Sequence, residues 1–201
     1  MKLIIISGPS GSGKTLLSKL ILKKIENGII LNTDNYYRTG IFSKIFSKIV
    51  NSYFDKRISF NSRMFKRDLK FILRNRFSKY SYKYNFKRKS IKKIYKNTKN
   101  IRFIIVEGIF SKEISKSFSG NPCIFIDLKT KKKICLKRVI KRDCKERGKS
   151  KYLAQKDFLD AWRIFYKNNK IDNARNYLKK FIVRNKSDLN YLLKKITKIM
   201  S

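Results

Sequence analysis

The chain has 201 residues, of which 42% are hydrophobic, and this is enough for one well-buried domain. It carries 52 Lys and Arg against 13 Asp and Glu, a formal charge of +39, and it has no histidine. The longest apolar runs fall short of the ~18 residues of a membrane span, and three cysteines without a C-x-x-C pair argue against a disulfide framework or a zinc site. We therefore expect a cytoplasmic protein without a membrane partner.

The first elements form a strand, a glycine-rich turn and a helix. The run Leu3–Ile6 predicts a buried strand, and a helix begins near Gly13 and ends at Asn27-Gly28, which would cap it. The turn between them has the spacing G-x-x-x-x-G-K-T of a phosphate-binding loop (P-loop). Its residues are Gly8, Pro9, Ser10, Gly11, Ser12, Gly13, Lys14 and Thr15.

The chemistry of this loop predicts ATP and Mg²⁺ as cofactors. The glycines let backbone N–H groups converge on one anion, and the helix dipole adds positive potential there. Lys14 can reach the β- and γ-phosphates, and the Thr15 hydroxyl can bind Mg²⁺. An ordinary glycine turn is the alternative, and the flanking strand and helix argue against it.

Further elements alternate along the chain. Strands are predicted at 29–32, 101–106, 123–126 and 181–183, and a hairpin at 80–86 and 91–95. Helices are predicted at 41–50, 61–75, 131–147, 151–168 and 188–199, with Leu153, Phe158, Ala161, Trp162 and Phe165 as the buried stripe of the fourth. This alternation indicates an α/β fold with a mainly parallel sheet covered on both faces.

Ligands of such sheets bind at the carboxyl ends of the strands, where acids follow three of the predicted strands. We interpret Asp34 as the general base, with a helix cap as the alternative, and Glu107 as a Mg²⁺ ligand, with an N-cap or loop carboxylate as the alternative. Asp127 is interpreted as structural.

The acceptor side depends on one acid, four aromatics and a basic cluster. Asp55 can accept hydrogen bonds from vicinal sugar hydroxyls, unless it forms a surface ion pair. Tyr37, Phe54, Tyr84 and Phe86 can flank a flat base, although aromatics at alternate positions are often core. Four cations around one helix can close over the triphosphate as a lid, with a solvated surface as the alternative: Arg138, Arg142, Arg147 and Lys149.

Together these motifs resemble the uridine kinase/phosphoribulokinase family, and are most similar to uridine–cytidine kinases, over about residues 2–168. The resemblance rests on Gly8–Thr15, Asp34-Asn35-Tyr36-Tyr37, Phe54-Asp55, Tyr84-Asn85-Phe86, Glu107-Gly108-Ile109 and Arg142-Asp143…Glu146-Arg147-Gly148.

The resemblance implies one P-loop kinase domain over residues 1–201, a three-layer sandwich with a five-stranded sheet. It implies an acceptor-binding insert at about 51–99 and an arginine lid at about 136–150. The implied activity is transfer of the γ-phosphate of ATP to the 5′-hydroxyl of uridine or cytidine. Asp34 would be the catalytic acid, and Asp55 with Arg138 would hold the ribose hydroxyls. The pocket for the base would be lined by Tyr37, Phe54, Tyr84 and Phe86, with Arg142, Arg147 and Lys149 in the lid.

Three departures weaken the pyrimidine assignment and leave the kinase prediction intact. Lys89 stands where uridine–cytidine kinases generally have a histidine that contacts the pyrimidine. Lys56-Arg57-Ile58 replaces a turn that usually contains proline. Lys149 replaces an arginine of the lid and lacks its planar fork.

Two other functions stay open. A kinase of the same family could act on a sugar phosphate, a pantothenate-like acid or a nicotinamide riboside-like compound. A nucleic-acid-binding ATPase is the remote alternative suggested by the charge. Because basic residues run from Lys2 to Lys198 without a stripe or tail, we expect only nonspecific binding of polyanions. The oligomeric state is left open.

Overall fold

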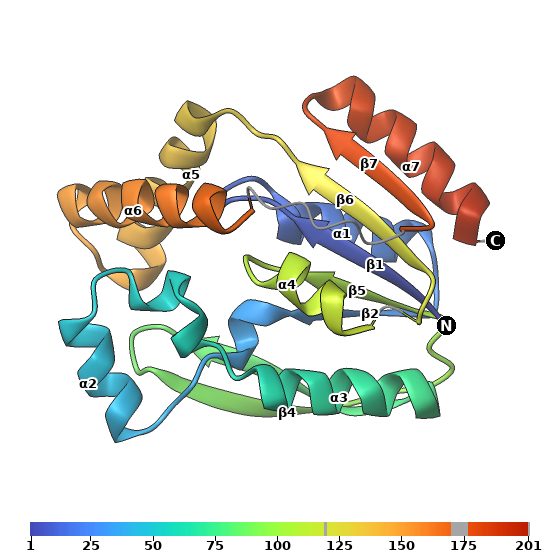
Figure 1. Ribbon diagram of the computed structural model, residues 1–201, viewed down its shortest axis with the longest axis horizontal. Coiled ribbons are helices and arrows are strands. Elements are labelled where there is room, and N and C mark those ends of the chain that lie inside the picture. Colours follow the sequence, from blue (N-terminus) through green and yellow to red (C-terminus); the bar gives the residue numbers. More distant parts are fainter. Residues whose placement is uncertain (119, 170–176, 201) are drawn as a thin grey trace.

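Five strands form one parallel sheet in the computed structural model, which describes residues 1–118, 120–169 and 177–200. Their order is β2 (Gly28–Asn32), β5 (Phe103–Glu107), β1 (Lys2–Ser7), β6 (Cys123–Leu128) and β7 (Lys179–Val183). The central strands are continuous apolar runs, as expected for a sheet that is buried on both faces. The predicted α/β fold with a five-stranded parallel sheet is confirmed (Figure 1).

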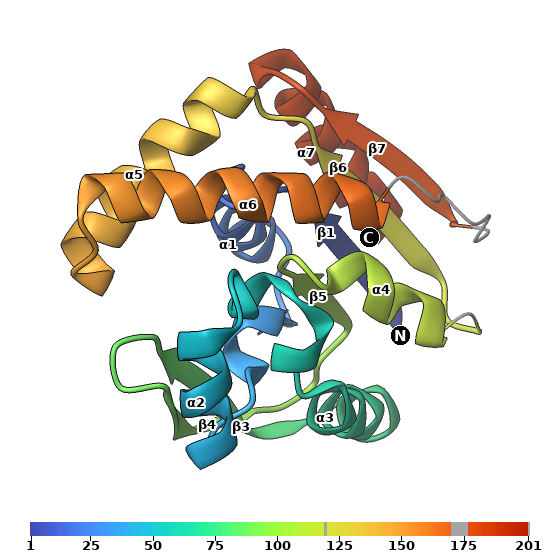
Figure 2. The same cartoon turned by 60° about the vertical axis from the view of Figure 1, so that its left-hand side comes forward.

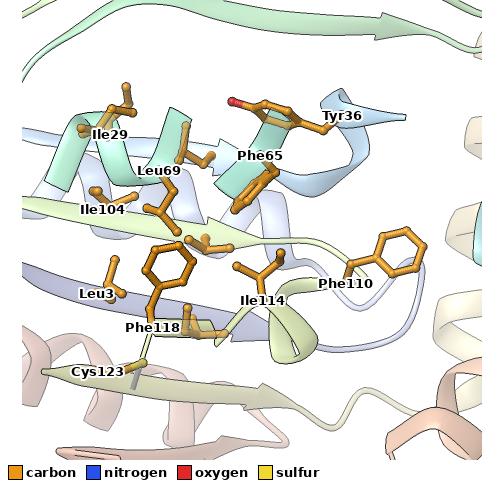
Figure 3. Packing of buried hydrophobic residues seen from close by; sticks show 14 of the residues in the cluster. Leu3, Ile29, Tyr36, Phe65, Leu69, Ile104, Phe110, Ile114, Phe118 and Cys123 are labelled. Carbon is orange, nitrogen blue, oxygen red and sulfur yellow. The ribbon is translucent and has the colours of Figure 1, made fainter. Parts of the chain in front are cut away.

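Helices cover both faces of this sheet. On one face, α1 (Lys14–Lys24) and α7 (Lys186–Met200) pack against alternate residues of β1. On the other face, α3 (Ser62–Asn75) and α4 (Ser111–Ser115) contribute side chains such as Phe65 and Ile114 (Figure 3). Successive side chains of β1 therefore pack into two separate cores, one on each face of the sheet.

The remaining elements surround the carboxyl ends of the strands. Helices α5 (Lys132–Arg147) and α6 (Lys151–Asn169) pack against each other there (Figure 2). The segment between β2 and β5 contains α2 (Ile41–Ile49), α3 and the antiparallel hairpin of β3 (Ser78–Asn85) and β4 (Ser90–Thr98). Short 3₁₀ turns are η1 (Thr33–Tyr36), η2 (Tyr53–Asp55), η3 (Arg57–Ser59) and η4 (Lys116–Phe118).

Three sequence-based expectations differ from the structure in detail. Helix α1 ends at Lys24, and Gly28 opens β2, where a Cβ would lie 2.2 Å from the Phe103 ring of the adjacent strand. Leu153 of α6 is exposed, and Ala154 takes the buried position instead. Asp127 lies within β6 and not after it, because pairing with β7 continues to Leu128; its carboxylate contacts Lys129 at 2.9 Å.

No helix in the described part of the chain is long and apolar enough to cross a membrane.

Candidate active site

The P-loop has the backbone geometry that its glycines predict. Gly11 has φ 78°, and a Cβ there would lie 2.6 Å from the Cys135 carbonyl oxygen, so a side chain does not fit. The Lys14 ammonium is buried and donates to the carbonyl oxygens of Gly8 (2.9 Å) and Pro9 (3.0 Å). Burial lowers the pKa of Lys14, and the carboxylates of Glu107 and Asp34 partly oppose this shift. The loop is therefore closed upon itself around a buried cation.

Glu107 lies next to this loop at the end of β5. The pairing of β2 with β5 aligns it with Asn32, whose side-chain N–H donates to Glu107 Oε1 at 2.8 Å. The Thr15 hydroxyl donates to the same oxygen at 2.9 Å. Burial, together with Asp34, raises the pKa of Glu107 to about 7. Glu107 is a buried strand residue, and the alternative of a loop carboxylate is therefore wrong.

Asp34 lies in the first turn of η1, close enough to Lys14 for its carboxylate to oppose the lowering of the Lys14 pKa. The cap of this turn is Asn32, whose Oδ1 accepts from the Asp34 backbone N–H at 2.7 Å. Asp34 is therefore not the capping residue. Its Oδ1 is buried and, within the described part of the chain, has no hydrogen-bond partner. An unpaired carboxylate oxygen next to a P-loop is suited to accept a proton or to face a cation.

A cavity of about 350 Å³ adjoins the loop. It is lined by Ser10 of the P-loop and by six of the predicted residues, which come from η2, the hairpin turn and the end of α5: Phe54, Asp55, Phe86, Arg142, Arg147 and Lys149. Burial, and next Asp34, raise the pKa of Asp55 to about 7, against the opposing effects of Arg147 and Lys149. The structure thus brings P-loop, acceptor and lid residues together around one cavity.

Two predicted aromatics do not line this cavity. Tyr37 and Tyr84 are 3% and 5% exposed and belong to the core, with ring centroids 5.2 Å apart. They pack edge-to-face against Phe54 and Phe86, which do reach the cavity. The alternative of core aromatics therefore holds for Tyr37 and Tyr84, which support the cavity wall from behind.

Arg138 also lies elsewhere than the resemblance implied. Its guanidinium donates to the carbonyl oxygen of Gly11 at 3.3 Å, on the P-loop, and it is not among the residues that line the cavity with Asp55. This geometry gives no support to a shared role with Asp55 at ribose hydroxyls. Arg138 and Arg142 share one face of α5, but Arg138 lies one turn nearer the start of the helix, where α5 approaches the P-loop.

The lid cations converge on Asp143, which the sequence motif contains but to which no role was assigned. This carboxylate is buried and contacts Arg142 (2.7 Å), Arg147 (3.3 Å) and Lys149 (3.8 Å). Lys149 also contacts Asp157 of α6 at 2.5 Å. The Arg147 guanidinium lies over the Phe86 ring, 3.7 Å from its centroid, which links lid and hairpin.

Two further residues were missed. Asn32 connects Glu107 to the Asp34 turn, and Asn35 Oδ1 accepts from the Tyr84 backbone N–H at 3.2 Å, which ties the hairpin to that turn. The spacing Asn32-Thr33-Asp34 is a signal for a side-chain cap that could have identified the first. The contact of Asn35 joins segments 49 residues apart and has no local signal.

Comparisons with known proteins agree with this geometry. The model of the phosphoribulokinase / uridine kinase family matches residues 3–169. No curated protein matches the chain. Among solved structures, one from Silicibacter sp. TM1040, named for a fructose transport system kinase, is 15% identical with a TM-score of 0.60, covering 90% of this chain and 89% of that one. The YGR205w protein is 13% identical with a TM-score of 0.62, covering 90% and 85%. At these identities the two structures show similarity of fold.

Proposed function

The chain belongs to the phosphoribulokinase/uridine kinase family, a family of ATP-using kinases, and from this premise we propose that it phosphorylates the 5′-hydroxyl of a nucleoside, uridine or cytidine. One observation carries the proposal: a single cavity is lined both by P-loop Ser10 and by Asp55, Phe86 and Arg147. A volume of about 350 Å³ suits a small organic acceptor.

The proposed reaction is direct transfer without a covalent enzyme intermediate. The P-loop amides and Lys14 bind the triphosphate, for which Lys14 exchanges its contacts with the carbonyls of Gly8 and Pro9. The acceptor hydroxyl loses its proton to Asp34 while its oxygen bonds to the γ-phosphorus. The bond from that phosphorus to the β–γ bridging oxygen breaks, and ADP leaves. Arg142 and Arg147 stabilise the charge on the transferring group.

Mg²⁺ fits the residues present at this site. Thr15 and Glu107 offer a hydroxyl and a carboxylate, the hard oxygen ligands that Mg²⁺ prefers, and it usually needs only one or two carboxylates besides phosphate. The raised pKa of Glu107 and the unpaired Oδ1 of Asp34 indicate carboxylates that a cation would stabilise. When bound there, the ion would neutralise phosphate charge.

A specific observation favours a second candidate, an acceptor that itself carries an anionic group. One face of the Phe86 ring is covered by Arg147, so that face is not free to stack on a base. Lys48 and Lys89 add further cations to the cavity, and Lys89 stands where the family's histidine would contact a pyrimidine. A sugar phosphate or a pantothenate-like acid would satisfy these groups.

A panel of acceptors tested with γ-labelled ATP distinguishes the two. Phosphorylation of uridine or cytidine supports the first proposal, and turnover of a sugar phosphate or hydroxy acid without any nucleoside supports the second. Hydrolysis of ATP that is stimulated by RNA and transfers nothing to small acceptors would refute both.

A further inference from the structure

Helix α2 turns its apolar side away from the protein. Five large apolar residues share one face of this nine-residue helix and are exposed by 41% to 79%. They are Ile41, Phe42, Ile45, Phe46 and Ile49. A helix on a protein surface normally buries such a face and exposes its polar side. The orientation of α2 is the reverse.

Polar contacts fix this reversed orientation. Ser43 is 4% exposed; its hydroxyl donates to the Arg38 carbonyl at 2.8 Å and lies 3.2 Å from the Tyr53 hydroxyl. Ser47 Oγ accepts from the Lys89 ammonium at 2.6 Å. The helix is thus attached to the protein by its serines, and rotating it to bury the apolar face would break these bonds.

Basic residues border the apolar face, and acids are absent from this part of the sequence. Lys44 and Lys48 are exposed on the helix itself. The contact of Lys89 with Ser47 brings the hairpin turn beside the serine side of α2, opposite the apolar face (Figures 1 and 2). The sequence contains no Asp or Glu between Asp34 and Asp55.

Charge and size argue against two possible occupants of this face. A second copy of the chain would also carry a charge of +39, which disfavours association. A helix of nine residues is about 13 Å long and ~10 Å wide, a footprint of roughly 130 Å², whereas a stable interface covers ~800 Å² per partner. Nucleic acid would pair with the lysines and leave five apolar side chains in water.

We propose that α2 binds the surface of an anionic lipid bilayer, lying flat in the headgroup region. Phe42 and its apolar neighbours enter the acyl boundary, and Lys44 and Lys48, which are exposed along the edge of the apolar face, contact headgroup phosphates. An amphipathic helix with apolar Phe and Ile beside lysines has the composition of such interfacial helices. This departs from the expectation of no membrane partner.

Vesicle flotation with the full chain tests the proposal, independently of any acceptor. We expect binding to vesicles of phosphatidylglycerol and phosphatidylcholine and not to phosphatidylcholine alone. The double variant Phe42→Ser/Ile45→Ser should weaken binding to anionic vesicles by about tenfold or more. Tyr152→Ser is the matched control, since Tyr152 is 78% exposed on α6 and Phe42 is 79% exposed on α2. It should bind like the unmodified chain.

A Phe42→Trp variant provides a second measurement that does not depend on removing the apolar face. Its emission should shift to shorter wavelength with anionic vesicles, relative to the unmodified chain with Trp162 alone. Absence of vesicle binding, equal binding by the double variant, or no emission shift would overturn the proposal. So would a dimer in solution that the double variant abolishes, or RNA binding that depends on Phe42 and Ile45.

Discussion

The nucleotide side and the acceptor side of the site are built differently. The nucleotide side is formed mainly by backbone: positive-φ glycines, strand ends and the start of α1. The acceptor side is formed by side chains from η2, the hairpin turn and α5, and it contains Lys89 and Lys149, two of the departures from the family pattern. A backbone cradle tolerates little change, whereas side chains can be exchanged one at a time. The phosphate donor is therefore more strictly determined than the acceptor.

The largest effect is expected at Asp34, whose charge affects both Lys14 of the loop and Asp55 of the cavity. Asp34→Asn should lower kcat by about 10²–10⁴-fold, the usual contribution of a positioned base. Binding of ATP should change little, because the P-loop stays intact. Steady-state kinetics and titration with nucleotide measure the two effects. A variant that keeps most of its kcat would show that Asp34 is not the base.

A change confined to the nucleotide side is the second test. Lys14→Ala should lower kcat by about 10²–10³-fold, because a buried cation at the transferring phosphate is lost. Lys19→Ala, an exposed position on the same helix, is the control and should leave kcat unchanged. Equal kinetics for Lys14→Ala and Lys19→Ala would contradict the assignment of the loop.

Removing the carboxylate that gathers the lid cations should have an intermediate effect. Asp143→Asn takes away the shared partner of Arg142, Arg147 and Lys149, and we expect kcat/KM to fall about tenfold, as for the loss of a hydrogen bond between charged groups. Asp160→Asn is the control, because the Arg163 side chain that Asp160 contacts is 79% exposed. If both variants have the same kcat/KM, Asp143 does not position the lid.

The smallest effect concerns pH and the acceptor side alone. The pKa of Asp55 is raised from 3.8 to about 7, so its carboxyl is protonated below pH 7 and accepts hydrogen bonds poorly. The acceptor KM should fall several-fold as pH rises through about 7, while the KM for ATP stays constant. Asp55→Asn should raise the acceptor KM and remove this pH dependence. If the acceptor KM of Asp55→Asn still changed with pH, the pH dependence would belong to another group.

The raised pKa of Asp55 also affects stability, which should fall as pH rises while acceptor binding improves. The folded chain keeps a proton on Asp55 that the unfolded chain releases above about pH 4. The contribution of Asp55 to the free energy of unfolding therefore declines as pH rises from about 4 to about 7 and is constant beyond that. Denaturant titrations at a series of pH values give the free energy of unfolding. Its change with pH should differ between the unmodified chain and Asp55→Asn from about pH 4 to about pH 7, and not outside this range.

Local signals account for much that the sequence predicted correctly. The run Leu3–Ile6, the glycines that follow it and the start of α1 each depend on neighbours within a few residues, so propensity and spacing identified them. The same holds for Glu107 at the end of an apolar strand. The errors at Gly28 and Leu153 arose where tertiary packing prevailed: the Phe103 ring leaves no space for a Cβ at Gly28, and the smaller Ala154 takes the buried position.

The sequence by itself determined the fold class, the P-loop and the acids at the edge of the sheet, because these follow from periodicity and from glycine and lysine at fixed spacing. Only the tertiary structure decided that Tyr84 is core, that Arg138 lies on the loop, that Asp143 gathers the lid cations and that α2 faces outward. Periodicity shows that one side of a helix is apolar, but the contacts with distant segments determine which way that side turns.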